Sequence, residues 1–149
     1  IDKLSYYEAQ HGKTEADEAD MRFVCTPATE YDAFAFANAI MDGRRDTALD
    51  ILRDYRFRRV EPLVILGDVI RVFCDMAGVA AMQGGGATDR EIAGVLKLHE
   101  FKVALYRKSL SRMRPGALRQ ALDACNAADR TLKLSPQGYT ALERLICSV

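Results

Sequence analysis

Three consecutive glycines, Gly84–Gly86, are the first feature of this 149-residue sequence that could carry chemistry. A phosphate-binding loop uses such glycines, but it needs a buried strand before them and a Gly-Lys-Ser/Thr sequence after them, so that backbone N–H groups and a lysine converge on the phosphates. Here a helical pattern precedes the glycines, and Ala87, Thr88 and Asp89 follow them. We therefore interpret the glycines as a turn between helices and predict no cofactor.

Other residues that could act in catalysis or bind a metal are scattered. His11 and His99 both lie at expected turns, and neither has a Ser, Cys or carboxylate at a spacing typical of a catalytic arrangement. The cysteines form no Cys-x-x-Cys pair or Cys/His cluster, so we expect buried free thiols in a reducing, cytoplasmic setting. The sequence thus predicts no catalytic residue, no metal site and no enzyme activity. The four cysteines are Cys25, Cys74, Cys125 and Cys147.

Basic side chains are concentrated in residues 97–119, where the only acid is Glu100. Such a run could follow nucleic-acid phosphates or meet an acidic partner, or it could be a solvated helix face. The excess of Arg over Lys in the chain favours recognition, because the guanidinium group pairs with carboxylate or phosphate. The candidate residues for contact with DNA or a partner are Lys102, Arg107, Lys108, Arg112, Arg114 and Arg119.

A loose helix-turn-helix pattern over residues 91–104 adds to that possibility. Two packed helices with a short turn occur in any helical bundle, however, and the polar side chains of the second helix suit phosphates better than bases. A small DNA-binding domain is therefore the alternative function that the sequence leaves open.

Charge and hydropathy exclude several classes of protein. The chain has 21 basic and 21 acidic residues, which argues against a histone-like protein and against a disordered acidic tail. The balance conceals an asymmetry, since residues 1–32 hold 8 acids and 3 bases (net −5) and residues 33–149 hold 13 acids and 18 bases (net +5). No apolar run approaches the roughly 20 residues that cross a bilayer, so we exclude a membrane protein.

Apolar residues recur at helical spacing throughout, and this predicts an all-α fold in which short turns join the helices of a bundle. We expect Asp32 to cap a helix that ends at Gly43, and Pro62 to begin a long helix whose apolar stripe includes Leu63, Leu66, Ile70, Phe73, Ala77 and Ala80. Thr88 and Glu91 form the clearest capping box, and Pro115 is expected to begin a later helix.

With these helices laid out, the chain resembles the C-terminal part of the delta subunit of the bacterial DNA polymerase III clamp loader. The resemblance depends on an ordered set of helix-packing patterns rather than on any single motif. The stretches that carry it are Leu4–Thr14, Phe34–Gly43, Glu61–Leu63, Ile92–Phe101, Leu118–Lys133 and Ala141–Leu145.

The resemblance implies the domain organisation and the partners. Residues 1–27 would be the C-terminal remnant of a small helical lid domain, and residues 28–149 would be the helical collar domain that joins the other loader subunits. In that family a separate N-terminal domain grips the sliding clamp, and it has no counterpart here, so we expect a fragment of a longer protein. The function implied is non-catalytic assembly of the loader in DNA replication, close to DNA, and the resemblance leaves weak contact with DNA open.

The resemblance also draws attention to four charged residues near the end of the chain. Asp129 and Lys133 stand one helical turn apart, so an intrahelical ion pair is the simple interpretation. Their position in the resemblance suggests instead that they connect this helix to the last one through Glu143 or Arg144. The sequence leaves both possibilities open.

Overall fold

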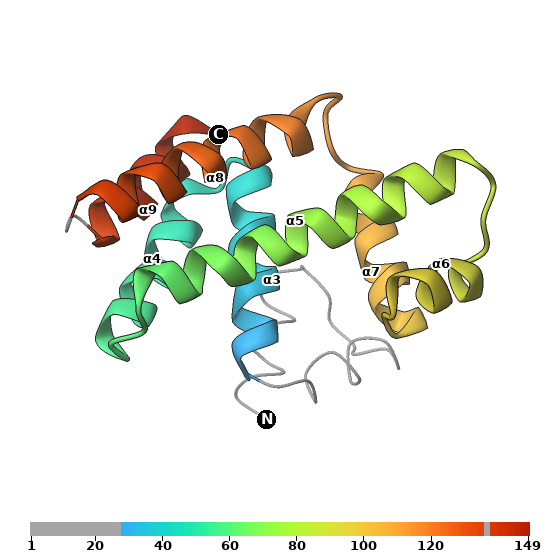
Figure 1. The fold of residues 1–149 in the computed structure, drawn as a ribbon, viewed down its shortest axis with the longest axis horizontal. Coiled ribbons are helices and arrows are strands. Elements are labelled where there is room, and N and C mark those ends of the chain that lie inside the picture. Colours follow the sequence, from blue (N-terminus) through green and yellow to red (C-terminus); the bar gives the residue numbers. More distant parts are fainter. Residues whose placement is uncertain (1–27, 136–137) are drawn as a thin grey trace.

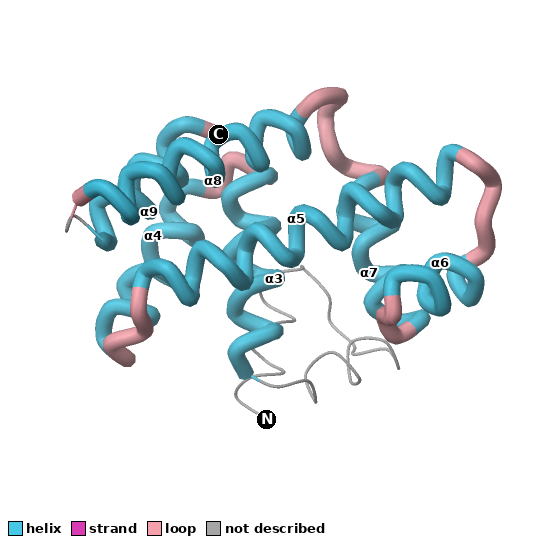
Figure 2. The backbone as a smooth tube through the Cα atoms, in the orientation of Figure 1, coloured by secondary structure: helices cyan, strands magenta, loops and turns pink. Residues whose placement is uncertain are grey.

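The structure, a computed structural model, describes residues 28–135 and 138–149, and every regular element within these ranges is a helix. The predicted all-α class is therefore confirmed, while the expectations for residues 1–27 lie outside the described residues. Figure 2 shows short loops joining most of these helices. The helices are α3 (Ala28–Met41), α4 (Arg45–Phe57), α5 (Pro62–Gly84), α6 (Asp89–Leu96), α7 (Glu100–Leu110), α8 (Ala117–Leu134) and α9 (Gly138–Ser148).

The long helix α5 is the element around which the others are arranged. It runs along the length of the molecule in Figure 1, with α4, α8 and α9 toward the end where it begins and with α6 and α7 toward the end where it stops. Helix α3 packs across its middle. Side chains on α5 that are removed from solvent supply much of the core: Ile65, Leu66, Val69, Val72, Phe73, Met76 and Val79.

The apolar stripe predicted for α5 is only partly right. Leu66 and Phe73 are buried, but Leu63 and Ala80 are exposed, and Ile70 and Ala77 are half-buried. The helix is apolar around most of its circumference, so more than one set of three- and four-residue spacings can be drawn on it. The buried set is decided by which neighbours pack against the helix, and periodicity does not reveal that.

Two predicted helix starts are also corrected. Helix α3 begins at Ala28, so Asp32 is inside the helix rather than its cap, and its carboxylate accepts a hydrogen bond from the Arg58 guanidinium at 2.8 Å. Helix α8 begins at Ala117 rather than at Pro115, because Gly116 precedes it in the left-handed conformation. The capping box of Thr88 and Glu91 is confirmed at the start of α6.

Three helices end in the same hydrogen-bonded turn, in which one residue has a positive φ. The residue is Gly43 after α3, Arg59 after α4 and Lys97 after α6, with φ of 68°, 56° and 54°. In each turn the next N–H donates to a carbonyl five residues back, which is the helix-ending pattern that usually employs glycine. A side chain with a Cβ costs about 1–2 kcal/mol in this conformation. The bonds are Arg44 to Ala39 (2.9 Å), Val60 to Tyr55 (3.1 Å) and Leu98 to Ala93 (3.0 Å).

The first residue of α9 makes an unusually close approach to the first residue of α5. A Cβ placed on Gly138 would lie 2.7 Å from Cγ of Pro62, closer than real Cβ atoms come to other heavy atoms. The proline ring cannot rotate away as a flexible side chain would. Glycine at this position therefore allows α9 to sit directly against the start of α5.

We predict that Gly138→Ala lowers the free energy of unfolding by about 1–3 kcal/mol, because the new methyl group overlaps the Pro62 ring. Gly67→Ala is the matched control, since a Cβ there meets no atom within 4 Å. The control should raise the stability by up to about 1 kcal/mol through helix propensity. Urea denaturation followed by circular dichroism measures both, and equal stability of the two variants would contradict the close approach.

Candidate functional site

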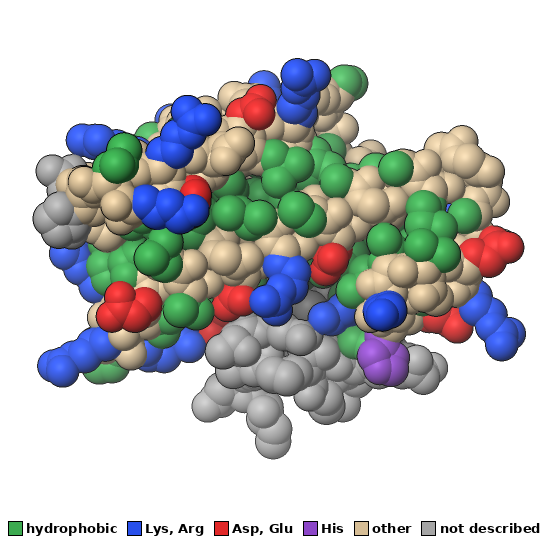
Figure 3. Space-filling model, in the orientation of Figure 1, with side chains coloured by type: hydrophobic (Ala, Val, Ile, Leu, Met, Phe, Trp, Pro, Cys, Tyr) green, Lys and Arg blue, Asp and Glu red, His purple; other side chains and the backbone are tan. Residues whose placement is uncertain are grey.

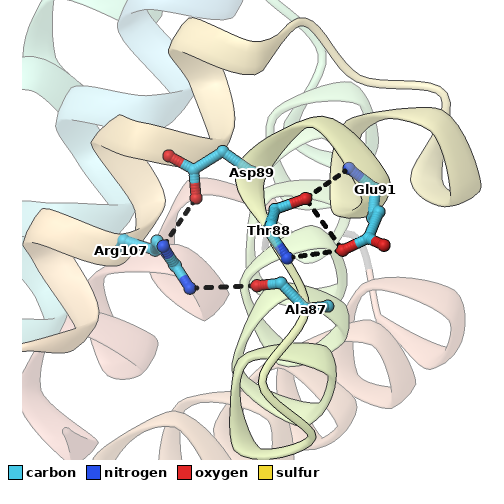
Figure 4. A network of polar contacts seen from close by, with 5 residues as sticks. All are labelled: Ala87, Thr88, Asp89, Glu91 and Arg107. Atoms are coloured by element: carbon cyan, nitrogen blue, oxygen red, sulfur yellow. Dashed lines mark hydrogen bonds and ion pairs between the residues drawn. The ribbon is translucent and has the colours of Figure 1, made fainter.

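Arg107, one of the predicted contact residues, lies between two helices instead of extending from the surface. Its Nη1 is 2.7 Å from Oδ1 of Asp89, and its Nη2 donates to the carbonyl of Ala87 at 3.3 Å. Figure 4 shows this guanidinium facing the segment that leads into α6. Arg107 Nε and Asp89 Oδ1 are buried without a well-oriented hydrogen bond, so charge attraction is the main part of this contact. Arg107 thus fastens α7 to the start of α6.

The same segment carries the capping box that begins α6. The Thr88 hydroxyl accepts from the Glu91 N–H at 3.4 Å, and the Glu91 carboxylate accepts from both the Thr88 N–H and the Thr88 hydroxyl at 2.8 Å (Figure 4). Two hydrogen bonds lower the pKa of Glu91. The larger effect comes from the Thr88 backbone N–H and the smaller one from the Thr88 hydroxyl. Since α6 has only eight residues, these caps supply a large part of its local stability.

The other predicted basic residues are spread over three segments. Lys102 and Lys108 lie on α7, Arg112 and Arg114 lie between α7 and α8, and Arg119 lies on α8. All but Lys102, which is half-buried, are exposed. Arg114 donates to the side-chain oxygen of Gln120 at 3.0 Å. A DNA- or partner-binding role for these side chains stays a prediction.

The four charged residues near the end of the chain belong to separate contacts. Lys133 donates to the Asp129 carboxylate at 2.6 Å within α8. Glu143 lies 3.9 Å from the Arg56 guanidinium and so links α9 to α4. Arg144 is exposed and makes no ion pair within the described residues. The geometry therefore shows the intrahelical pair, and the contact of α9 runs to α4.

The cysteines depart from expectation. Cys125 is buried, and its burial raises the pKa of the thiol to about 12, so it remains protonated. Cys74 and Cys147 are free but exposed, so the prediction of buried thiols is wrong for them. Both positions flank an apolar stripe of their helix instead of lying in it. Cys25 lies outside the described residues.

Within the described ranges, no three His, Cys, Asp or Glu side chains gather in a way that could hold a metal ion. No helix of the described residues has the length and apolar character needed to cross a membrane.

A surface that the sequence analysis missed lies where α4, α5 and α9 meet. The end of α4, the α4–α5 turn (residues 58–61), the first residue of α5 and the first turn of α9 line an open pocket of about 510 Å³. Its lining includes two arginines, Arg56 and Arg59, and one acid, Glu61. The Arg56 guanidinium stands over the Tyr139 ring, 5.3 Å from its centroid.

Large apolar side chains are exposed around this pocket and at the neighbouring end of α8. Phe57 is 86% exposed, Leu63 51%, Val64 53% and Leu134 88%. Figure 3 shows hydrophobic side chains over the first turns of α5, beside Lys and Arg side chains at the end of the molecule where Figure 1 places the α4–α5 turn. Exposed apolar side chains that gather in one region are typical of binding surfaces. The signal in the sequence was a phenylalanine between arginines, at residues 56–59.

Comparisons with known proteins point to one family. Residues 30–149 match the family model described as DNA polymerase III delta subunit, C-terminal domain. Among solved structures, the DNA clamp loader delta protein of Bacillus subtilis has a similar fold, with a TM-score of 0.72 and 21% sequence identity. The match covers 98% of this chain and 43% of that protein, so the chain spans less than half of its relative's length. No curated protein sequence matches the chain.

We predict that Arg107→Ala lowers the free energy of unfolding by about 1–2 kcal/mol, because it leaves Asp89 without its counter-charge beside α6. Arg112→Ala is the matched control, since Arg112 is exposed and lies outside this network. The control should stay within about 0.5 kcal/mol of the original protein in urea denaturation. If both variants unfold alike, Arg107 does not fasten the two helices.

Glu91 should make the stability depend on pH in a specific direction. Its pKa is lowered in the folded state, so its stabilising effect is complete above its ordinary value of 4.5 and is lost as the pH falls through the lower folded value. The original protein should therefore lose more stability than Glu91→Gln between pH 6 and pH 3. Denaturation curves at both pH values test this, and an equal loss would show that the carboxylate contributes nothing.

Proposed function

We propose that this chain is an assembly module of the clamp loader in DNA replication, because it belongs to the family of DNA polymerase III delta subunits and matches their C-terminal domain. The family match over residues 30–149 is the single observation that carries this proposal. It includes nearly all of α3 and the whole of α4–α9. The similarity in fold to the Bacillus subtilis clamp loader delta protein agrees with it.

The proposal extends to the domain organisation. Residues 28–149 are the collar domain that joins the other loader subunits, and residues 1–27 are the end of the preceding helical lid domain. The start of the family match at residue 30 supports a boundary close to residue 28. The sliding clamp is contacted by a part of the subunit outside this chain.

This module acts without catalytic residues of its own and works in the cytoplasm, where the loader serves the polymerase. Its contribution to replication is to hold subunits in place through helix faces. The exposed apolar side chains around the α4–α5 turn supply the kind of surface that such a role requires.

DNA binding by the basic region is the second candidate. The observation in its favour is that Arg112 and Arg119 are exposed and have no ion pair within the described residues. Against it, the charge of Arg107 is already paired with Asp89, and the remaining basic side chains are spread over α7, α8 and the segment between them. We expect DNA to be near this surface and to be bound only weakly.

The 149-residue chain should co-elute with the other loader subunits in size-exclusion chromatography and should fail to bind the isolated sliding clamp. The reason is that the proposed collar domain contacts subunits, whereas the clamp-gripping part is elsewhere. Tight binding to the clamp would overturn the domain assignment.

A gel-shift titration at physiological salt separates the second candidate from the first. We expect no shift of duplex DNA at micromolar protein. A micromolar or tighter complex that is lost in the double variant Arg112→Glu, Arg119→Glu would instead establish a DNA-binding domain, because charge reversal removes the attraction to phosphates.

A further inference from the structure

The α4–α5 turn contains an arginine where the backbone favours glycine. Arg59 has φ of 56° in a helix-ending turn whose hydrogen bonds match those after α3, where the corresponding residue is Gly43. Glycine would form this turn with less strain, and the side chain of Arg59 has no ion pair or hydrogen bond within the described residues. Within the described residues, the guanidinium therefore makes no polar contact that would stabilise the fold. Lys97 has the same strain after α6, so the case for a function of Arg59 depends on its surroundings as well as on its backbone.

Tyr139 on α9 holds the backbone of this turn through its hydroxyl. The Tyr139 hydroxyl donates to the carbonyl of Val60 and lies 3.3 Å from that of Tyr55, which ties α9 to the α4–α5 turn and to the last turn of α4. Burial raises the pKa of the Tyr139 hydroxyl, and the nearby negative charge of Glu61 raises it further. The hydroxyl therefore stays protonated and can donate a hydrogen bond. A surface fixed in advance loses little entropy when it binds a partner.

Two kinds of side chain are displayed on this support. Phe57, the last residue of α4, is 86% exposed, and Arg59 lies two residues further on. Arg56 and Arg59 face the pocket together with the single acid Glu61, and Arg56 already has Glu143 at 3.9 Å. Arg59 thus presents a guanidinium that makes no ion pair within the described residues, two positions after an exposed aromatic ring. Aromatic residues and arginine are the side chains most enriched at the centres of protein interfaces.

We propose that Phe57 and Arg59 form a docking site for an acidic, apolar-containing segment of another loader subunit. The carboxylate of that segment pairs with Arg59 at the pocket, and its apolar side chain covers Phe57 and the neighbouring Leu63. Charge complementarity selects an acidic segment, since Arg59 is the one lining cation without a partner in the described residues. This proposal depends on the assembly function above and specifies where assembly takes place.

A protein segment fits this surface better than single-stranded nucleic acid. An aromatic ring beside arginine could stack a base, but such sites follow the backbone with a continuous basic groove. Here Arg53 and Arg58 are already paired with Asp50 and with Asp32 and Asp54, so no continuous basic groove leads away from the pocket. The exposed aliphatic side chains Leu63 and Val64 also suit a protein surface.

The test separates binding from folding, because Arg59→Gly removes the guanidinium and also the backbone strain. We expect its urea midpoint to be no lower than that of the original chain, while its affinity for the other loader subunits falls by at least about tenfold. Phe57→Ala should lose affinity to a similar degree without a change in midpoint, since the ring is exposed.

Lys97→Gly is the matched control. Lys97 occupies the same left-handed position after α6, far from the α4–α5 turn, so its replacement relieves the same strain without touching the docking site. Its affinity for the loader subunits should stay within about twofold of the original chain, a change too small to indicate a lost contact. Affinities are measured by surface plasmon resonance with the purified loader subunits, at low and at physiological salt.

The outcomes are distinct. Weaker subunit binding by Arg59→Gly and Phe57→Ala, with Lys97→Gly unaffected, supports the docking site. Unchanged binding by all three variants overturns it and leaves the assembly function intact. Failure of the original chain to bind any loader subunit overturns the assembly function itself. Loss of single-stranded DNA binding by the two variants, with subunit binding retained, would assign the surface to nucleic acid and also overturn the proposal.

Discussion

Burial of the apolar side chains of α5 is the interaction on which the arrangement of the other helices depends. Five of the six other described helices pack against it, and its buried residues extend from Ile65 to Val79. Removing such side chains from water is the dominant favourable contribution to folding. Because no single neighbour covers α5, the helix has to be apolar around most of its circumference, and its two ends can then support different structures. The start of α5 carries the α4–α5 turn and α9, while its far end carries α6 and α7.

The sequence predicted those features of the fold that local interactions determine. Thr88 and Glu91 form their capping box through atoms three residues apart, so the pattern alone identified the start of α6. Pro62 begins α5 for a similar reason, since its fixed φ suits a first helical turn. Features that depend on distant residues were missed. Asp32 was expected to cap a helix, but it lies inside α3 and pairs with Arg58, 26 residues away, and the buried face of α5 depends on five neighbours at once.

At the candidate site, too, the sequence revealed local features and missed contacts between distant residues. The basic run was visible as composition, but the role of Arg107 follows from its contact with Asp89 across two helices, and no local pattern announces it. The surface around Phe57 was overlooked because a single apolar residue among arginines shows no periodic pattern that would indicate whether it is buried or exposed. Only the structure reveals that Phe57 faces solvent and that Arg59 adopts a left-handed backbone. The most informative residue was Arg59, because arginine disfavours the left-handed backbone conformation that it adopts here.

The modest size of α6 has a consequence for how this protein moves. With eight residues it is too short to persist alone, and apart from α7 it packs mainly on the far end of α5. The cost of releasing it is therefore limited to the capping box, the Arg107 contact and a few buried side chains such as Ile92, well below the cost of exposing the core around Phe73. We therefore expect α6 to open as a separate unit, so that its amide hydrogens exchange with solvent before those of α5, which require the whole domain to unfold.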